Sequence, residues 1–222
     1  MTKETLAENL QSIKARIEQA ALASGRNSSA ITIVGATKTV PVETIHAAFT
    51  FGIGNFGENY VQEAKSKKDI LAKLGVNPTW RMIGHLQKNK VGDAIELFDI
   101  IETVDSVRLA ETIAGKAAKE PIPIMLQVNM TGEISKFGFA PQETANAYKT
   151  LKRLPELSII GLMTIAPVVS NPQEARPFFR GLRQLRDDLG LRELSMGMTN
   201  DFEVAIQEGA TIIRIGRALF GG

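Results

Sequence analysis

A lysine follows an apolar segment near the N-terminus, where a charged side chain is unexpected. The segment ITIVGATKTV covers residues 31–40, and Pro41 ends it. Because side chains alternate along a strand, Val34, Ala36 and Lys38 share one face. Among apolar neighbours and near other cations, an amine loses part of its proton affinity and becomes a nucleophile toward carbonyl groups. Lys38 is therefore a candidate for Schiff-base chemistry; the alternative is a strand-end lysine that extends its amine into water.

Two glycine-containing segments near the C-terminus have the composition of a phosphate site. SMGMTND (195–201) places Gly197 and Thr199 before a helix that we expect to start near Asn200, and RIGRALFGG (214–222) follows the last apolar run. Free N–H groups at a helix N-terminus bind phosphate. TIM barrels often build such a site from the loops after strands seven and eight. Each segment alone is more simply a cap or a turn, but their occurrence on consecutive strands favours a phosphate-bearing ligand.

A second cation is predicted to reach the same place. Arg214 shares a strand face with Ile212 and Gly216, so it would enter the barrel mouth together with Lys38 if these faces point inward. A nucleophilic amine beside a phosphate site suggests an aldehyde with a phosphate tail. Pyridoxal 5'-phosphate (PLP) is the leading candidate, and a sugar phosphate handled by a Schiff-base aldolase is the second. The colour of the pure protein separates them, since the Schiff base of PLP absorbs visible light.

Eight apolar runs separated by helix-like segments must position these residues. The runs do not alternate strictly, which is typical of parallel strands buried on both faces. Eight such strands in one chain predict a single α/β domain, residues 1–222, with a (β/α)8 TIM-type barrel and the site at the C-terminal ends of its strands. An open doubly wound sheet is the alternative. The predicted strands are ITIVGA (31–36), GIGNF (52–56), WRMIG (80–84), DIIETV (99–104), IPIMLQVNM (122–130), LSIIGLMTIA (157–166), ELSMG (193–197) and TIIRIG (211–216).

Two helices are visible as apolar stripes. The first precedes the first strand, and Thr5 and Glu8 could form a capping box at its start. The second lies before the seventh strand. The stripes consist of Leu6, Leu10, Ile13 and Ile17 in the first helix, and of Phe178, Leu182, Leu185 and Leu189 in the second.

The composition excludes several classes of function. Of the 222 residues 44% are hydrophobic and 23% charged, with a net charge of +2, so no strong field points to nucleic acid. The lysine-rich segment 63–73 alternates lysines with acids and is typical of a solvated helix face. There is no cysteine, which fits a reducing compartment, and we expect a cytoplasmic protein. With only His46 and His85, a histidine-rich metal site is not expected. No signal peptide and no apolar run of about 18 residues is found, so no membrane association is expected.

Seven segments together resemble the YggS/PROSC family of pyridoxal phosphate homeostasis proteins. They occur in the family order from about residue 6 to residue 221. The resemblance implies a fold-type III barrel like the N-terminal domain of alanine racemase, with an extra N-terminal helix, and PLP held as a Schiff base on Lys38. The segments are IVGATKTVP, GIGNFGENYVQE, RMIGHLQKNK, EISKFGF, GLMTIAP, LSMGMTNDFEVAI and IIRIGRALFG.

The resemblance also implies how the phosphate is held. Thr199 and the neighbouring backbone of Met198 should bind it, together with the N–H groups of Gly216 and Arg217, and Ser195 is a further candidate. Arg217 stands where threonine or serine often follows the glycine, so a hydroxyl is lost there and a guanidinium takes its place.

The rest of the cofactor site follows from the same resemblance. Arg214 matches the arginine that faces the pyridine nitrogen, and Asn59 and Met163 match positions that line the ring. His85 stands where proline is common. An arginine cannot accept the proton of the ring nitrogen, so PLP would be a weaker electron sink than when paired with a carboxylate.

The implied function is PLP homeostasis, by storage, buffering or delivery, and amino- and keto-acid balance, without robust catalysis. The partners would be PLP and PLP-dependent apoenzymes, and a monomer is expected because the dimerising domain of alanine racemase is missing. The alternative is a weak PLP-dependent amino-acid racemase with Lys38 as one base and Tyr60 or water as the other. Tyr60, at the start of an expected helix, is otherwise a half-buried packing residue.

Overall fold

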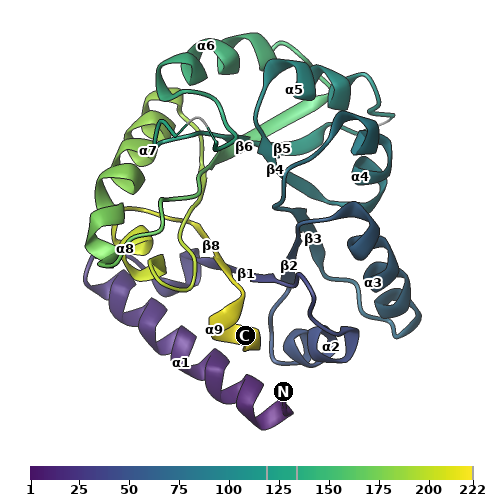
Figure 1. Ribbon diagram of the computed structural model, residues 1–222, viewed down its shortest axis with the longest axis vertical. Helices are drawn as coiled ribbons and strands as arrows, with labels where there is room; N and C mark the ends of the chain where they lie inside the picture. Colours follow the sequence, from purple (N-terminus) through teal and green to yellow (C-terminus); the bar gives the residue numbers. More distant parts are fainter. Residues whose placement is uncertain (119, 134, 222) are drawn as a thin grey trace.

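The computed structural model describes residues 1–118, 120–133 and 135–221, and in this part of the chain eight parallel strands close into a barrel surrounded by helices (Figure 1). Each strand pairs with the next along the chain, and β8 pairs with β1. This confirms the (β/α)8 barrel and excludes the open sheet. The strands are β1 (Thr32–Ala36), β2 (Asn55–Glu58), β3 (Thr79–Met82), β4 (Ile100–Val104), β5 (Ile122–Gln127), β6 (Leu157–Met163), β7 (Glu193–Ser195) and β8 (Ile212–Ile215).

Helices form the outer layer and alternate with the strands. In Figure 1 they ring the barrel in chain order from α2 to α8, as right-handed crossovers between parallel strands require. They are α1 (Lys3–Leu22), α2 (Val42–Thr50), α3 (Val61–Lys73), α4 (Val91–Leu97), α5 (Val107–Ala114), α6 (Pro141–Leu151), α7 (Arg176–Leu189), α8 (Phe202–Gln207) and α9 (Arg217–Phe220).

All eight predicted strands exist, but several boundaries differ. The largest error is in β2, which was expected at 52–56. Gly52 has φ +96° and belongs to the turn before the strand, so the strand starts at Asn55 and includes Gly57 and Glu58. Elsewhere the apolar runs continue up to three residues past the strand ends. Several of these residues, such as Val128, Ala166 and Met196, stay buried after the backbone has left the ladder.

The N-terminal helix is confirmed, and its apolar stripe is buried. Its cap was predicted wrongly: Thr2 is the N-cap, and its hydroxyl accepts a hydrogen bond from the Thr5 N–H. The helix packs on α8 and α9, and its Arg16 forms an ion pair of 2.6 Å with Glu203 (Figure 1). It therefore covers the side of the barrel where the chain returns to its first strand.

The helix before β7 is confirmed as α7, with a different buried face. Phe179 and Leu182 are fully buried, whereas Phe178, Leu185 and Leu189 are only half-buried. At the start of α7 the buried residue is thus Phe179 rather than Phe178, while Leu185 and Leu189 still pack against the core.

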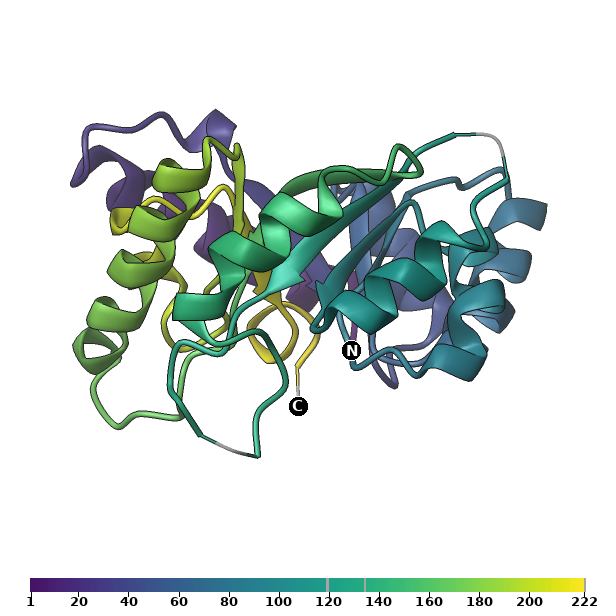
Figure 2. The same cartoon turned by 90° about the horizontal axis from the view of Figure 1, so that it is seen from above.

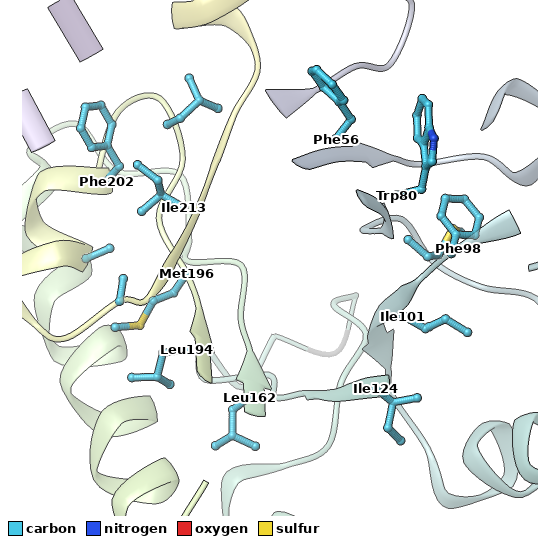
Figure 3. Packing of buried hydrophobic residues seen from close by; sticks show 14 of the residues in the cluster. Phe56, Trp80, Phe98, Ile101, Ile124, Leu162, Leu194, Met196, Phe202 and Ile213 are labelled. Carbon is cyan, nitrogen blue, oxygen red and sulfur yellow. The ribbon is translucent and has the colours of Figure 1, made fainter. Parts of the chain in front are cut away.

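The core has two separate layers. The larger one fills the space between strands and helices, and Figure 3 shows Phe56, Ile101 and Leu162 pointing away from the barrel axis toward it. The smaller one, a cluster of Val34, Met125, Met163 and Ile212, comes from opposite sides of the closed sheet and therefore lies in the lumen. The β1–β8 register pairs Val34 with Arg214, so Arg214 shares this inward face, as predicted.

The loops after the strands gather at one end of the barrel. The loop between β5 and α6 and the C-terminal end of the chain lie on the same side in Figure 2. Among the described residues, no helix has the length and apolarity to span a membrane.

Close contact between β6 and β7 depends on a glycine, which gives the first prediction. A Cβ on Gly161 would lie 2.2 Å from the carbonyl oxygen of Glu193, a backbone atom that cannot move independently of the sheet. We expect Gly161→Ala to lower the free energy of unfolding by about 1–3 kcal/mol in urea denaturation. Gly54→Ala is the matched control, since a Cβ there meets open space. Equal stabilities of the two variants would contradict the close packing of β6 on β7.

Candidate functional site at the barrel mouth

Lys38 lies two residues past the end of β1, at the C-terminal edge of the barrel. Its side chain is exposed, and its ammonium lies 5.5 Å from the centroid of the Tyr60 ring. The expectation that apolar neighbours bury this amine is therefore wrong, because the strand ends before residue 38 and the side chain leaves the sheet. Tyr60 is the N-cap of α3, as expected, but it is 55% exposed rather than half-buried. The barrel mouth therefore contains an exposed amine, that of Lys38, close to the ring of Tyr60.

The backbone on both sides of Lys38 is fixed by buried charges. Lys67 donates hydrogen bonds to the carbonyl oxygen of Thr37 (2.5 Å) and to Glu58 and Glu63 (both 2.7 Å). The Thr37 hydroxyl donates to Glu58 (2.6 Å), and the Thr39 N–H donates to Glu63 (2.6 Å). The side chain of Lys38 is therefore exposed, while the backbone on both sides of it is held by hydrogen bonds.

Arg214 is the second cation at the mouth, and it is buried in the lumen. One of its terminal nitrogens donates to the Ser195 hydroxyl (2.6 Å), the other to the carbonyl oxygen of Thr164 (2.7 Å). Burial lowers the pKa of Arg214, while the negative charges of Glu102 and Asp201 oppose this change. A guanidinium stays protonated in proteins, so the lumen contains a fixed positive charge.

The charge of Arg214 is balanced across the barrel through a hydroxyl. Ser195 donates to one carboxylate oxygen of Glu102 (2.5 Å), and Arg81 donates to the other (2.9 Å). Arg81 also donates to Asn55 (2.9 Å). We call these five residues, Asn55, Arg81, Glu102, Ser195 and Arg214, the lumen network.

The contacts of Ser195 within the lumen network fix the position of its side chain. Its side chain is fully buried, and its hydroxyl is occupied by Glu102 and Arg214. The family resemblance makes Ser195 a candidate for binding phosphate, which stays a prediction; in this structure Ser195 points inward on β7, beneath the mouth. Its role in this structure is to hold Arg214.

The two predicted phosphate loops meet. The Thr199 hydroxyl accepts a hydrogen bond from the Ala218 N–H (3.3 Å), which joins the loop after β7 to the start of α9. The N–H of Arg214 donates to the carbonyl oxygen of Gly197 (3.0 Å). Gly197 has φ +92°, and a Cβ there would lie 2.5 Å from that of Ala205, so the backbone approaches α8 as closely as only glycine allows.

One predicted phosphate donor is already engaged. The Met198 N–H donates to the Asp201 carboxylate (2.6 Å), and Asp201 rather than Asn200 caps α8. Burial raises the pKa of Asp201, and the Met198 N–H and Arg214 partly offset that rise. The backbone of Met198 is therefore not free to bind an anion here, although its side chain is 37% exposed at the mouth.

The other predicted residues lie around these loops. Gly216 adjoins β1, since its Cβ would lie 3.6 Å from that of Ala36, two residues before Lys38. Arg217 follows it as an exposed residue at the start of α9. Met163 is buried in the lumen cluster, and Asn59 is half-buried just past β2. All of these residues therefore belong to the mouth or to the lumen beneath it.

The structure adds residues that sequence reasoning missed. Glu102 and Arg81 were placed only within strands, although a charge in the middle of an apolar run was a signal of an inward polar contact. Lys67 was assigned to a solvated helix face; it is 6% exposed, because Glu58 and Glu63 stand where they can pair with it.

A cavity of about 500 Å³ lies beyond the predicted site, at the loops after β3, β4 and β5. His85 stacks on Phe137 at its wall, with ring centroids 3.7 Å apart, and its Nδ1 lies 3.2 Å from Asp105. None of the nine predicted site residues lines this cavity.

Comparisons with known proteins agree with this geometry. The model of the family described as "Alanine racemase, N-terminal domain" matches residues 3–222. The "Pyridoxal phosphate homeostasis protein" of Aquifex aeolicus is 41% identical over 222 residues, 96% of each chain. The structure of PipY from Synechococcus elongatus PCC7942 with PLP bound is 33% identical with a TM-score of 0.85, covering 97% of this chain and all of that one.

A more distant likeness concerns the fold alone. Alanine racemase from Clostridium difficile 630 is 14% identical with a TM-score of 0.75, and the match covers 99% of this chain and 57% of the racemase. The seven sequence segments, the barrel and these matches lead to one family. The chain belongs to the alanine racemase N-terminal domain family and, within it, to the pyridoxal phosphate homeostasis proteins.

Proposed function

We propose that this protein binds PLP as a Schiff base on Lys38 and takes part in PLP homeostasis, by storage, buffering or delivery, and in amino- and keto-acid balance, without robust catalysis. The observation that carries the proposal is the pairing of a reachable amine, Lys38, with a fixed guanidinium, Arg214, on neighbouring strands. A phosphorylated aldehyde needs both a nucleophile and a positive field, and these two residues supply them.

The loops after β7 and β8 fit the phosphate of such a ligand. The Thr199 hydroxyl accepts its hydrogen bond from Ala218, so its own proton is left to donate to a phosphate oxygen. The N–H groups of Gly216 and Arg217 stand at the first turn of α9, where a helix has no acceptor for them. Gly197 lets the backbone of the loop after β7 approach α8 closely beside these N–H groups.

The lumen supports binding rather than demanding chemistry. PLP supplies, when bound, an aldehyde that condenses reversibly with amines and a pyridine ring that is a strong electron sink only when its nitrogen is protonated. A guanidinium donates hydrogen bonds and accepts none, so Arg214 opposes a proton on a ring nitrogen that it faces. Ser195 and Thr164 hold Arg214 in place from two strands. Reversible linkage with weak catalysis suits a carrier.

The weak racemase remains a second candidate because of Tyr60. Its ring lies near the Lys38 ammonium, so its hydroxyl is within the same corner of the mouth. Tyr60 is 55% exposed, so water can also reach this corner of the mouth. We further propose a monomeric, cytoplasmic protein whose recipients are PLP-dependent apoenzymes.

The lysine gives the most direct prediction. Lys38→Ala should abolish the visible absorbance of protein incubated with PLP, because the Schiff base needs this amine. Lys65→Ala, which changes an exposed lysine of α3, is the control and should keep the absorbance. A visible band retained in Lys38→Ala and lost in another lysine variant would move the linkage elsewhere, and a wild-type protein without any band would favour the aldolase.

Thr199 is expected to act on the phosphate alone. Thr199→Val should weaken PLP binding roughly 10- to 150-fold, the loss of one hydrogen bond to a charged group. Binding of pyridoxal, which has no phosphate, should be unchanged in the same titration. Thr150→Val, an exposed hydroxyl on α6, serves as the matched control. If both ligands weaken equally, Thr199 supports the loop and does not bind the phosphate.

The two candidate functions differ in proton exchange. The carrier should exchange the α-proton of L- or D-alanine in deuterated water only at a trace rate when loaded with PLP. A rate well above that of free PLP, lost in Lys38→Ala and reduced in Tyr60→Phe, would establish the racemase. Proton NMR of the alanine pool measures this exchange directly.

A further inference from the structure

Three charged side chains from β2 and α3 surround the backbone of Lys38. Glu58 ends β2, while Glu63 and Lys67 stand one turn apart on α3, which lies outside the barrel beside β2 (Figure 1). We call Glu58, Glu63 and Lys67 the backbone clamp. None of them is among the residues expected to touch PLP.

The hydrogen bonds of the clamp end on the two neighbours of Lys38. Lys67 has three donors, and it uses one on the Thr37 carbonyl and the other two on the clamp carboxylates. Glu58 accepts from the hydroxyl of Thr37, and Glu63 accepts from the N–H of Thr39. The residue before Lys38 and the residue after it are thus tied to the same charged group.

The backbone at this point has a conformation that needs such support. Thr39 has φ +62°, the only positive φ of a non-glycine residue in the part of the chain that the structure describes. A β-branched residue is disfavoured there and persists when its surroundings fix it. The bond from the Thr39 N–H to Glu63, 2.6 Å, is the contact that does so.

The clamp is not explained by stability alone. The side chains of Lys67 and Glu58 are 7% and 0% exposed, and the second carboxylate oxygen of Glu58 has no hydrogen-bond partner among the described residues. Burial raises the pKa of Glu58, because the charged carboxylate loses its hydration there. Well-packed apolar side chains commonly replace a buried ion pair without loss of stability. The placement of this one around residues 37–39 points to a role in geometry.

The direction of Lys38 follows from this geometry. Thr37 points outward to Glu58 and β1 ends at Ala36, so the direction of the Lys38 side chain is set by the 37–39 turn and not by strand alternation. Rotation of the 37–39 turn would aim the amine away from the mouth, although the amine itself would remain exposed.

We propose that Glu58, Glu63 and Lys67 are positioning residues that fix the 37–39 turn and thereby aim the Lys38 amine at the barrel mouth. The proposal rests on the proposed function, in that Lys38 is the residue that carries PLP. The clamp acts through Thr37 and Thr39 and does not itself touch the ligand.

The experiment compares Lys67→Met and Glu63→Ala with Lys65→Met and with wild type. Lys65 lies on the same helix and is exposed, so Lys65→Met controls for loss of a helical lysine. Circular dichroism and urea denaturation first establish that each variant folds. Because Glu63 keeps 25% of its side chain in water, Glu63→Ala tests the proposal if the more buried Lys67→Met does not fold.

Two readouts separate positioning from a merely structural role. Hydrogen exchange of the Thr39 amide, followed by NMR without ligand, should accelerate at least about tenfold in both clamp variants, because its acceptor is lost or released. The rate at which PLP forms its visible band should fall roughly 10- to 100-fold, the effect of a misdirected nucleophile. Glu63→Gln retains a side-chain oxygen for the Thr39 N–H and should recover most of both properties.

The outcomes are distinguishable from a failure of the proposed function. Folded clamp variants with wild-type Thr39 exchange and a wild-type rate of band formation would overturn the clamp. A wild-type protein without a PLP band would overturn the proposed function; Thr39 exchange unchanged in Glu63→Ala would then overturn the clamp as well, whereas accelerated exchange would support the fixed turn.

Discussion

The burial of one guanidinium constrains the whole lumen. Arg214 can stay charged inside a barrel of apolar strands only if a carboxylate and several acceptors surround it, because an uncompensated buried charge costs several kcal/mol. Glu102 supplies the charge through Ser195, and Thr164 supplies a carbonyl. These contacts come from β4, β7 and the end of β6, so the charge of β8 is satisfied only when the barrel is closed.

The two cations of the mouth are held in opposite ways. Arg214 is immobile because each terminal nitrogen has a partner on another strand. Lys38 has an exposed tip on a fixed base, with Tyr60 over its ammonium. This difference suits the roles proposed for them: a counter-charge works best when it does not move, whereas a nucleophile must reach its electrophile and release it again.

The fold and much of the site followed from sequence pattern, for physical reasons. Parallel strands buried on both faces leave continuous apolar runs, and alternation along β8 predicts the inward direction of Arg214 that the structure shows. The family resemblance supplied the cofactor, which no pattern of apolar residues contains. The sequence did not predict contacts that depend on folding: the hydroxyl of Ser195 donates to Glu102, and the N–H of Met198 donates to Asp201.

The lysine-rich helix α3 shows a second limit. Alternating charges predict a solvated face, and Lys65 and Asp69 conform to this. Lys67 does not, because the strand that ends in Glu58 lies against that side of the helix. The charge pattern of a helix predicts which face an isolated helix would expose to water. Which of its lysines is buried depends also on the neighbouring strand.

The seam between β1 and β8 has a consequence for synthesis of the chain. Lys38 leaves the ribosome early, whereas Arg214 and Gly216, which lies against Ala36, emerge much later. The helix α1 likewise packs on α8 and α9, which are synthesised late. Contacts across such a separation form late, since the entropy of closing a long loop must be overcome first. A nascent chain thus carries Lys38 for most of translation without the closed mouth around it, and the proposed capture of a phosphorylated aldehyde can begin only when β8 has docked.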